Sequence, residues 1–308
     1  METYRILAFD GGGVRGVVTA VLLERLLRSA PNLIEAADLL AGTSSGGILA
    51  LGLAGGLSPA QLRRFFETIG PEIFHHSRRV FDAEAGQAPA ARYDNEALAR
   101  ELQRSLGEAV RLADLRKQVL VPAFDLDNEA ADPAKRSWRP KLFHNLPGSD
   151  DAERRIYHVA LYTSAAPTYF PSVDGFIDGG VYANNPSLVA LTHALGARGE
   201  NSAPIQHNFR LLSLGNGTVA KHIPGSRHDW GCTQWLSAGL LDLINDAGVA
   251  ITDLQCRQIL RERYFRFAPQ LPMDTQVMLD DSARLPELVD FAQRLDLSEL
   301  ASWIEVNW

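Results

Sequence analysis

This sequence of 308 residues contains few cysteines and carries no net positive charge. The cysteines are Cys232 and Cys256, and two residues so placed form neither a disulfide framework nor a cysteine-based metal site. The formal net charge is −7, which argues against the basic surface of a general nucleic-acid-binding protein. It also argues against adhesion to anionic membranes by bulk charge. We therefore expect no nucleic-acid partner and no bound metal.

The sequence also lacks a long apolar segment before Asp10, internal repeats and low-complexity tracts. We expect no signal peptide, and with so few cysteines we expect a reducing, cytoplasmic location. Hydrophobic residues make up 46% of the chain, which is ordinary for a globular protein. No linker rich in proline, glycine or serine divides it. We expect one domain, with a core over residues 1–217 and a helical C-terminal portion over residues 218–308.

Charge is absent from Leu39–Leu62, and a segment of this length raises the question of a transmembrane helix. Its glycines and the polar run Thr43, Ser44 and Ser45 make it too polar and too flexible, so we expect a buried strand, a turn and a helix. The turn fits G-x-S-x-G with Ser44 at its centre, the pattern of a nucleophile elbow. Such a turn places the hydroxyl at a helix N-terminus, where backbone dipoles favour negative charge. The alternative is an ordinary loop.

A glycine-rich loop follows the first predicted strand, Tyr4–Phe9, and precedes a predicted helix over Val17–Leu27. Gly11, Gly13 and Gly16 satisfy G-x-G-x-x-G, which is compatible with dinucleotide binding. The acidic residue expected about twenty positions further on would be Glu35 or Asp38, and neither clearly ends a second strand. Exposed backbone N–H groups in such a loop can instead bind an oxyanion. A simple tight turn is the third interpretation.

An acidic turn completes the set of candidate motifs. Asp178 follows Phe176 and Ile177 and precedes two glycines, which predicts a carboxylate at a strand end next to a sharp turn. Further predicted strands are Val119–Phe124 and Phe209–Leu214. Further predicted helices are Ser58–Thr68 with a capping box at Gln61, Asp94–Leu106, Val159–Ala165, Pro186–Leu195, Trp235–Asn245, Ala250–Arg261 and Leu285–Arg294. Loops are predicted over His75–Ala91 and Glu129–Pro140, and Met273–Asp281 is predicted to be a loop or a short strand.

The order of the three motifs resembles the patatin-like phospholipase family of serine acyl hydrolases. The matching segments are Asp10–Gly16, Gly42–Gly47 and Asp178–Gly180, with Ser164–Phe170 and Asn184–Pro186 as similar surroundings. The resemblance covers roughly Arg5 to Gly217. It implies a three-layer α/β/α fold with a central, mostly parallel sheet and makes residues 1–217 the catalytic core.

The resemblance also implies a role for each matching residue. Ser44 matches the nucleophile, and Asp178 matches the base of a Ser–Asp dyad. Gly11, Gly12 and Gly13 match the loop whose N–H groups form the oxyanion hole. Arg15 matches a basic position of that loop, which we expect to contact substrate. No cofactor is implied. Asp10 is expected to order the glycine loop.

Histidine is the main rival to Asp178 as the base, because a serine hydroxyl usually relies on a neighbouring imidazole. The histidines are scattered, and none has a motif around it: His75, His76, His144, His158, His193, His207, His222 and His228. Ser45 is the second candidate for the nucleophile, although it lies off the centre of the elbow.

Three functions remain open from the sequence. The first is a lipid acyl hydrolase acting on phospholipid or lysophospholipid esters, in transient contact with a membrane surface. The second is an acyltransferase using the same acyl-serine. The third is a nucleotide-binding protein. The sequence does not determine the oligomeric state.

One basic and aromatic stretch, residues 135–143, is a candidate for that membrane contact. Trp138 and Phe143 would enter the lipid interface, where tryptophan is favoured. The cations Lys135, Arg136, Arg139 and Lys141 would meet phosphate headgroups. The alternative is a solvated loop whose aromatic residues pack on the core.

Overall fold

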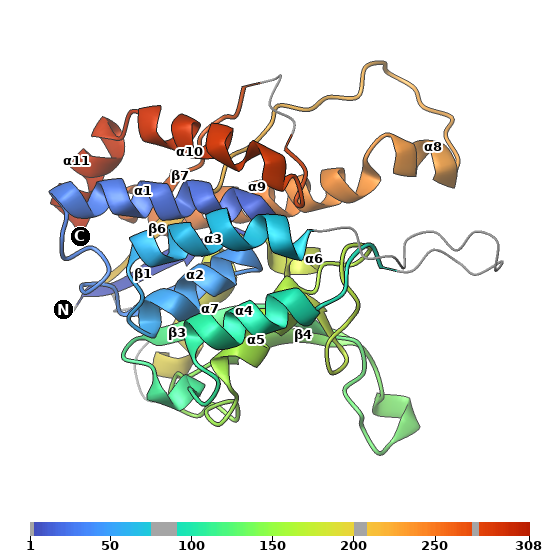
Figure 1. Ribbon diagram of the computed structural model, residues 1–308, viewed down its shortest axis with the longest axis horizontal. Coiled ribbons are helices and arrows are strands. Elements are labelled where there is room, and N and C mark those ends of the chain that lie inside the picture. The colour runs from blue at the N-terminus through green and yellow to red at the C-terminus, as the bar shows by residue number, and fades with distance from the viewer. Residues whose placement is uncertain (1–2, 75–90, 200–207, 273–276) are drawn as a thin grey trace.

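The computed structural model describes residues 3–74, 91–199, 208–272 and 277–308. Its strands are β1 (Thr3–Phe9), β2 (Leu39–Gly42), β3 (Gln118–Asp125), β4 (Arg139–His144), β5 (Phe176–Asp178), β6 (Asn208–Leu214) and β7 (Tyr264–Phe267). They form one seven-stranded sheet in the order β4-β3-β2-β1-β6-β7, and β5 also pairs with β3 (Figure 1). Five strands run parallel, whereas β4 and β5 are antiparallel to β3.

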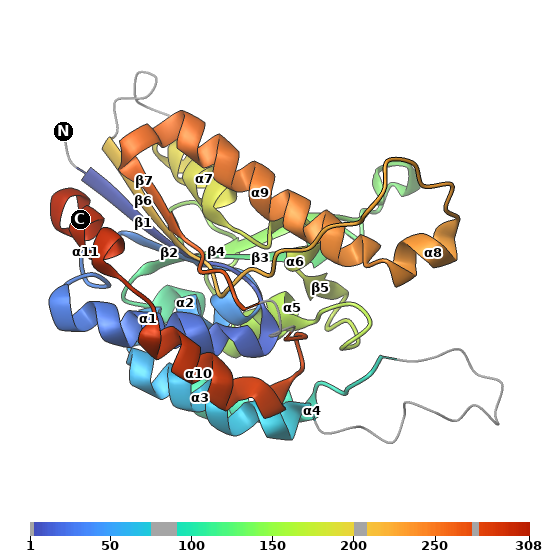
Figure 2. The ribbon, with the colours of Figure 1, turned by 90° about the horizontal axis from the view of Figure 1, so that it is seen from above.

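Helices cover both faces of this sheet. They are α1 (Gly16–Ser29), α2 (Ser45–Ala54), α3 (Pro59–Ile73), α4 (Glu96–Leu106), α5 (Ile156–Ser164), α6 (Gly180–Ala183), α7 (Ser187–Gly199), α8 (Cys232–Ser237), α9 (Leu240–Leu260), α10 (Leu285–Arg294) and α11 (Ser298–Asn307). The helices α1, α2 and α5 lie on one face, with α3, α4 and α10 outside them, whereas α7 and α9 cover the other (Figure 2). This is the predicted three-layer α/β/α fold with a central, mostly parallel sheet.

The uncharged stretch Leu39–Leu62 is explained by burial within this fold. It supplies strand β2 and helix α2, and every residue of both is buried. Central strands of a parallel sheet have helices on both faces, so they read as continuous apolar runs. No helix in the described part of the chain is long and apolar enough to span a membrane. The predicted capping box at the start of α3 is confirmed, because the Ser58 side chain accepts a hydrogen bond from the Gln61 N–H and the Gln61 side chain accepts one from the Ser58 N–H.

Strand register brings the three sequence motifs to one edge of the sheet. Phe9 lies beside Gly42 of β2 and beside Leu214 of β6, so the segments that follow all three strands meet at the carboxyl edge. Asp178 enters the same region because it pairs with Ala123 of β3. Residues far apart in the sequence thus converge where ligand sites of open α/β sheets form.

The C-terminal portion differs from its prediction in three ways. It is mostly helical, but it also contributes strand β7, which pairs in parallel with β6. The two predicted helices between Trp235 and Arg261 become the short α8 and one continuous helix, α9. Helix α11 was not predicted. Most of the loop predicted over His75–Ala91, and part of the one over Met273–Asp281, lies outside the described residues.

Candidate active site

Ser44 occupies a strained turn between β2 and α2. Its backbone has φ 55° and ψ −126°, a conformation that side-chain-bearing residues rarely adopt. The flanking glycines are required sterically, because a Cβ at Gly42 would overlap the Gly46 carbonyl and one at Gly46 would overlap the Phe9 carbonyl. The turn thus has the strand–turn–helix context of a nucleophile elbow, with Ser44 as N-cap residue of α2.

Thr163 holds this turn against its neighbours. The Ser44 N–H donates to Thr163 Oγ1 at 2.8 Å, and the Thr163 hydroxyl donates to the Pro122 carbonyl at 2.6 Å. Thr163 is fully buried on α5, and Pro122 belongs to β3. The elbow is therefore connected by side-chain hydrogen bonds to two further elements. Sequence reasoning did not find Thr163, because no motif surrounds it.

Asp178 lies next to Ser44 and is buried, with 5% of its surface exposed. Burial raises the pKa of its carboxyl group to about 6, although hydrogen bonds from the Gly180 N–H and the Ser44 hydroxyl act in the opposite direction. The Gly180 N–H donates to Asp178 Oδ1 at 2.7 Å. The structure thus brings together the predicted nucleophile and base, and desolvation makes this carboxylate a stronger base than an exposed aspartate.

The three N–H groups of the glycine loop differ in what they contact. The Gly11 N–H donates to the Asn184 carbonyl at 3.0 Å, so this donor is engaged away from substrate. The Gly12 N–H donates to Ser45 Oγ at 3.1 Å. Among the described residues, none accepts a hydrogen bond from the Gly13 N–H. Of the predicted oxyanion hole, the Gly13 N–H therefore has no acceptor among the described residues, whereas the Gly12 N–H would exchange Ser45 for an oxyanion.

Two asparagines fill the space beside this loop. Asn184 Nδ2 donates to the Gly11 carbonyl at 3.2 Å, and Asn216 Nδ2 donates to the Asp10 carbonyl at 3.1 Å. A Cβ at Gly11 would overlap the Asn184 side chain, and one at Gly12 would overlap that of Asn216. Glycine is needed here because other residues approach the backbone so closely.

Arg15 contacts the loop rather than open space. Its Nη1 donates to the Gly217 carbonyl at 3.1 Å, and its Nε donates to the Gly12 carbonyl at 3.4 Å. Burial lowers the pKa of its guanidinium group, and the charges of Asp246 and Asp10 counteract this. In this geometry Arg15 braces the glycine loop, and its contact with substrate stays a prediction.

A buried ion pair anchors the residue before the glycines. Arg266 Nη1 and Nη2 donate to the two carboxylate oxygens of Asp10 at 3.0 and 2.5 Å, and Nη1 also donates to Ser213 Oγ at 2.8 Å. Burial lowers the pKa of Arg266, but the charge and hydrogen bonds of Asp10 outweigh that effect and the net shift is upward. The ordering role predicted for Asp10 thus acquires a partner on β7 that sequence reasoning missed.

A narrow apolar pocket of about 60 Å³ opens beside Ser44. It lies between α2, α3, α4 and the segment after α5, and Gly13 and Ser45 also border it. Its apolar lining comes from Val14, Ile48, Phe65, Phe66, Ile69, Ile73, Phe74, Leu98, Ala166, Tyr169, Phe170 and Leu279. Such a lining suits a hydrocarbon chain and offers little to a charged ligand.

None of the described histidines lines this pocket or hydrogen-bonds to Ser44 or Asp178. His144 and His193 stack on each other with ring centroids 4.2 Å apart, and burial together with that neighbour lowers the pKa of His144 to about 4. His75, His76 and His207 lie outside the described residues. The geometry therefore places Asp178, and no described histidine, against the serine.

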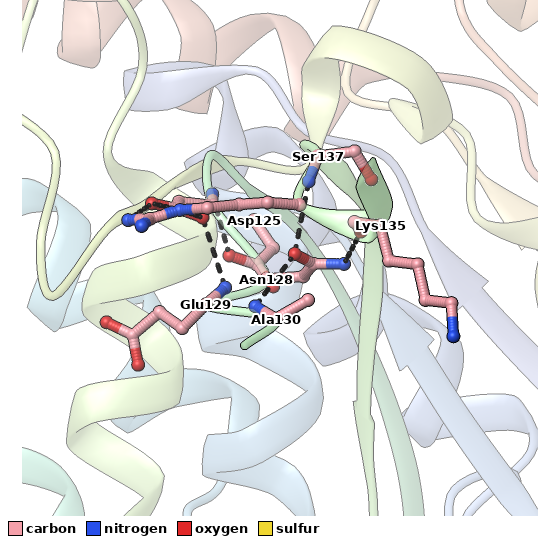
Figure 3. A network of polar contacts seen from close by, with 8 residues as sticks. Asp125, Asn128, Glu129, Ala130, Lys135 and Ser137 are labelled. Carbon is pink, nitrogen blue, oxygen red and sulfur yellow. Dashed lines mark hydrogen bonds and ion pairs between the residues drawn. The ribbon is translucent and has the colours of Figure 1, made fainter. Parts of the chain in front are cut away.

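The basic and aromatic stretch 135–143 differs from its prediction. Phe143 is fully buried and its ring packs on Phe176 and Tyr162, so it cannot enter a lipid interface. The cations are engaged in ion pairs: Lys135 with Asp132, Arg136 with Asp127, Arg139 with Asp125, and Lys141 with Asp151. Asn128 ties the loop together through its side-chain amide, as Figure 3 shows. Of the two aromatic residues, Trp138 keeps the predicted exposure, at 73%.

Several known proteins are similar to this chain over most of its length. A cGAMP-activated phospholipase of Pseudomonas aeruginosa is 33% identical over 273 residues, which cover 86% of this chain and 78% of that protein. Protein teg of Priestia megaterium is 28% identical over 333 residues, covering 100% of both chains. Patatin-08 of Solanum tuberosum is 27% identical over 339 residues, covering 96% of this chain and 84% of that protein.

Among solved structures, a chain of the heterodimeric ExoU–SpcU complex of Pseudomonas aeruginosa matches with a TM-score of 0.44 and 14% identity. The match covers 95% of this chain and 52% of that chain, so this protein spans about half the length of its structural neighbour. The model of the patatin-like phospholipase family matches residues 7–191, a range that contains the glycine loop, the serine elbow and Asp178. By this match over more than half of its length, the chain belongs to the patatin-like phospholipase family.

Proposed function

We propose that this protein is a lipid acyl hydrolase that cleaves fatty acyl esters through an acyl-Ser44 intermediate. The observation that carries the proposal is the position of Ser44, which occupies a strained turn, lines an apolar pocket and lies next to the buried Asp178 carboxylate. Family membership supports lipid hydrolase activity. The pocket supports an acyl chain as the recognised group, and we expect phospholipids or lysophospholipids as substrates.

The reaction follows from the positions of these groups. Asp178 accepts the Ser44 proton as the hydroxyl oxygen attacks the ester carbonyl, and the carbonyl oxygen becomes an oxyanion. The N–H groups of Gly12 and Gly13 stabilise that oxyanion, and a donor of this kind typically contributes about 10²–10³ in rate. Protonated Asp178 then gives its proton to the departing alcohol. Water, deprotonated by Asp178, attacks the acyl-serine and releases the fatty acid with Ser44 restored.

An acyltransferase is the closest alternative, since it would form the same acyl-Ser44 and pass the chain to an alcohol. The dinucleotide alternative has less support. The Gly11 and Val14 N–H groups donate to the carbonyls of Asn184 and Leu279, which leaves few backbone donors of this loop for a pyrophosphate. Asp38, a candidate ribose ligand, precedes β2 and accepts a hydrogen bond from the Arg5 N–H at 2.7 Å.

A fluorophosphonate probe tests the proposal directly, because it labels only an activated serine. We expect mass spectrometry to find the label on Ser44, and Ser44→Ala and Asp178→Asn to abolish labelling and hydrolysis of a soluble ester while folding is retained. Product analysis with and without an added alcohol separates hydrolase from transferase. Labelling of Ser45 in the wild type, or full labelling in Asp178→Asn, would contradict the dyad.

A further inference from the structure

The helix α9 has two apolar faces, and only one of them packs on the sheet. Cys256 and Leu260 are buried on the inner face. At 3.6 residues per turn, Leu243, Ile244, Ile251 and Leu254 share the opposite face. Six leucines and isoleucines of α9 have exposed fractions between 45% for Leu243 and 62% for Leu241. An exposed apolar face of this extent generally marks an interaction site.

The N-terminal half of α9 and helix α8 project beyond the carboxyl edge of the sheet, as Figures 1 and 2 both show. Leu236 of α8 is 51% exposed, and Ile244 of α9 is 53% exposed. Helix α9 contacts α6, the short helix that directly follows Asp178, so α9 lies near the catalytic residues. The apolar tip therefore stands beside the candidate active site.

A second projection at the same end carries Trp138. It is the loop between β3 and β4, which lies with α8 at the end of the molecule opposite the C-terminus in both views. The Asn128 side chain fixes this loop by bonding to Ala130, Lys135 and Ser137 (Figure 3). Trp138 is thus an exposed aromatic residue on an ordered support.

Two more exposed apolar residues lie between these projections and the catalytic residues. Val181, 43% exposed, belongs to the short helix α6 that follows Asp178. Met278, 55% exposed, precedes Leu279, which lines the acyl pocket. Exposed apolar residues are therefore also found in the segments that adjoin the catalytic carboxylate and the pocket.

We propose that α8, the first turns of α9 and Trp138 form a docking surface for a zwitterionic phospholipid bilayer. The inference rests on the proposed function, because a pocket for an acyl chain must receive that chain from a lipid aggregate. Two projections from distant parts of the sequence fit one flat, extended partner better than a single protein helix. Apolar side chains that enter the interface, with tryptophan at its edge, give the binding energy.

The charges around this surface determine which lipid it fits. In α9, Asp253 pairs with Arg257, and Asp242 pairs with Lys221. In the β3–β4 loop, Arg136 and Arg139 are likewise paired with carboxylates. Because these four cations are already paired with carboxylates, the surface gains less from anionic headgroups than a free basic patch would. Docking should therefore proceed on phosphatidylcholine alone and change little with salt, unlike docking through a free basic patch.

Co-sedimentation with phosphatidylcholine vesicles tests the surface without relying on catalysis. The test variants, in a Ser44→Ala background that preserves the vesicles, are Leu241→Gln with Ile244→Gln, and Trp138→Ala. The matched controls are Ile251→Gln with Leu254→Gln further along α9, and Val306→Gln near the C-terminus. We expect the double variant at the tip to weaken vesicle binding by about tenfold or more, and Trp138→Ala to weaken it less, while the controls bind like the parent.

The same tip variants with Ser44 intact should lose vesicle hydrolysis but keep the hydrolysis of a soluble short-chain ester. Absence of soluble-ester hydrolysis in the wild type would contradict the proposed function and leave the sedimentation result to stand by itself. Equal vesicle binding by tip and control variants would overturn the docking surface. A wild-type dimer in light scattering that both α9 pairs dissociate, with vesicle binding unchanged, would overturn it in favour of a second copy of the chain.

Discussion

Asp10 and Arg266 form a bidentate ion pair in which both side chains are almost completely buried, at 6% and 5% exposure. Asp10 ends the strand that leads into the glycine loop, and Arg266 lies on β7, beyond residues 7–191 that the family model matches. The C-terminal portion thus contributes to the geometry of the oxyanion loop. Because both charges of the pair are removed from water, the stability of each depends strongly on the presence of the other.

Removing one partner of this pair should be worse than removing both. We expect Arg266→Met or Asp10→Asn to lower the free energy of unfolding by about 3–5 kcal/mol, because each leaves a buried polar or charged group unpaired. The double variant should lose less than the sum of the two. Urea unfolding measures these changes, and additive losses would contradict direct coupling. In variants that remain folded, we expect kcat to fall more than KM rises, because the loop acts on the transition state.

The rate should depend on the ionisation of Asp178. Only the carboxylate can accept the Ser44 proton, and burial raises the pKa of Asp178 to about 6. We therefore expect kcat/KM for a soluble ester to be flat above pH 7 and to fall about tenfold per pH unit well below pH 6. Circular dichroism at pH 5 serves as the control for folding. An inflection that disappears in a histidine variant such as His158→Ala would indicate a histidine base instead.

The free energy of unfolding should depend on the ionisation of Asp178 in the opposite direction: it should fall as the pH rises, whereas the rate should increase. The pKa of Asp178 rises from 3.8 to about 6 on folding, so the folded state binds the proton more tightly. The resulting stabilisation is fully present below about pH 4 and is lost as the pH rises through about 6. At pH 8 the buried charge then costs about 3 kcal/mol. Asp178→Asn avoids that cost, and Asn can still accept the Gly180 N–H.

We expect urea unfolding at pH 8 to show Asp178→Asn more stable than the wild type by about 2–3 kcal/mol. Near pH 4 the difference should fall below about 1 kcal/mol, because the folded carboxyl group is then neutral and only part of the unfolded population is ionised. A difference of equal size at both pH values would contradict the assignment, since it would reflect packing rather than charge.

The sequence predicted those parts of the site that depend on local geometry. The elbow at Ser44 follows from its flanking glycines, and the start of α3 follows from Ser58 and Gln61. The short strand β7 was missed because Tyr264–Phe267 becomes a strand only by pairing with β6. Thr163, Asn216 and Arg266 were missed for the same reason. Thr163 contacts Ser44, and both Asn216 and Arg266 contact Asp10, which is far from them in the sequence. No rule of sequence spacing predicts such contacts.

The membrane-contact prediction for residues 135–143 also shows what composition alone cannot reveal. Residues 135–143 have the composition of an interfacial segment. Composition does not reveal that the Phe143 side chain points from β4 into the protein core, or that nearby carboxylates pair with the cations. The outer face of α9 was hidden because the pattern there was interpreted as two helices. Its inner and outer faces are both apolar, and only the packed structure shows which one lacks a partner.

The pocket should set the length of the acyl chain that the enzyme accepts. Ile69 of α3 is buried and lines this pocket, so Ile69→Phe adds volume where a long chain would lie. We expect kcat/KM for a long-chain ester to fall about tenfold or more, with little change for a short-chain ester that does not reach this residue. Overpacking should also cost about 1–3 kcal/mol of stability, which urea unfolding measures. Thr68→Phe is the matched control, since Thr68 is the adjacent exposed position on the same helix. Equal losses on both esters in Ile69→Phe, or the same chain-length shift in Thr68→Phe, would show that this pocket does not hold the acyl chain.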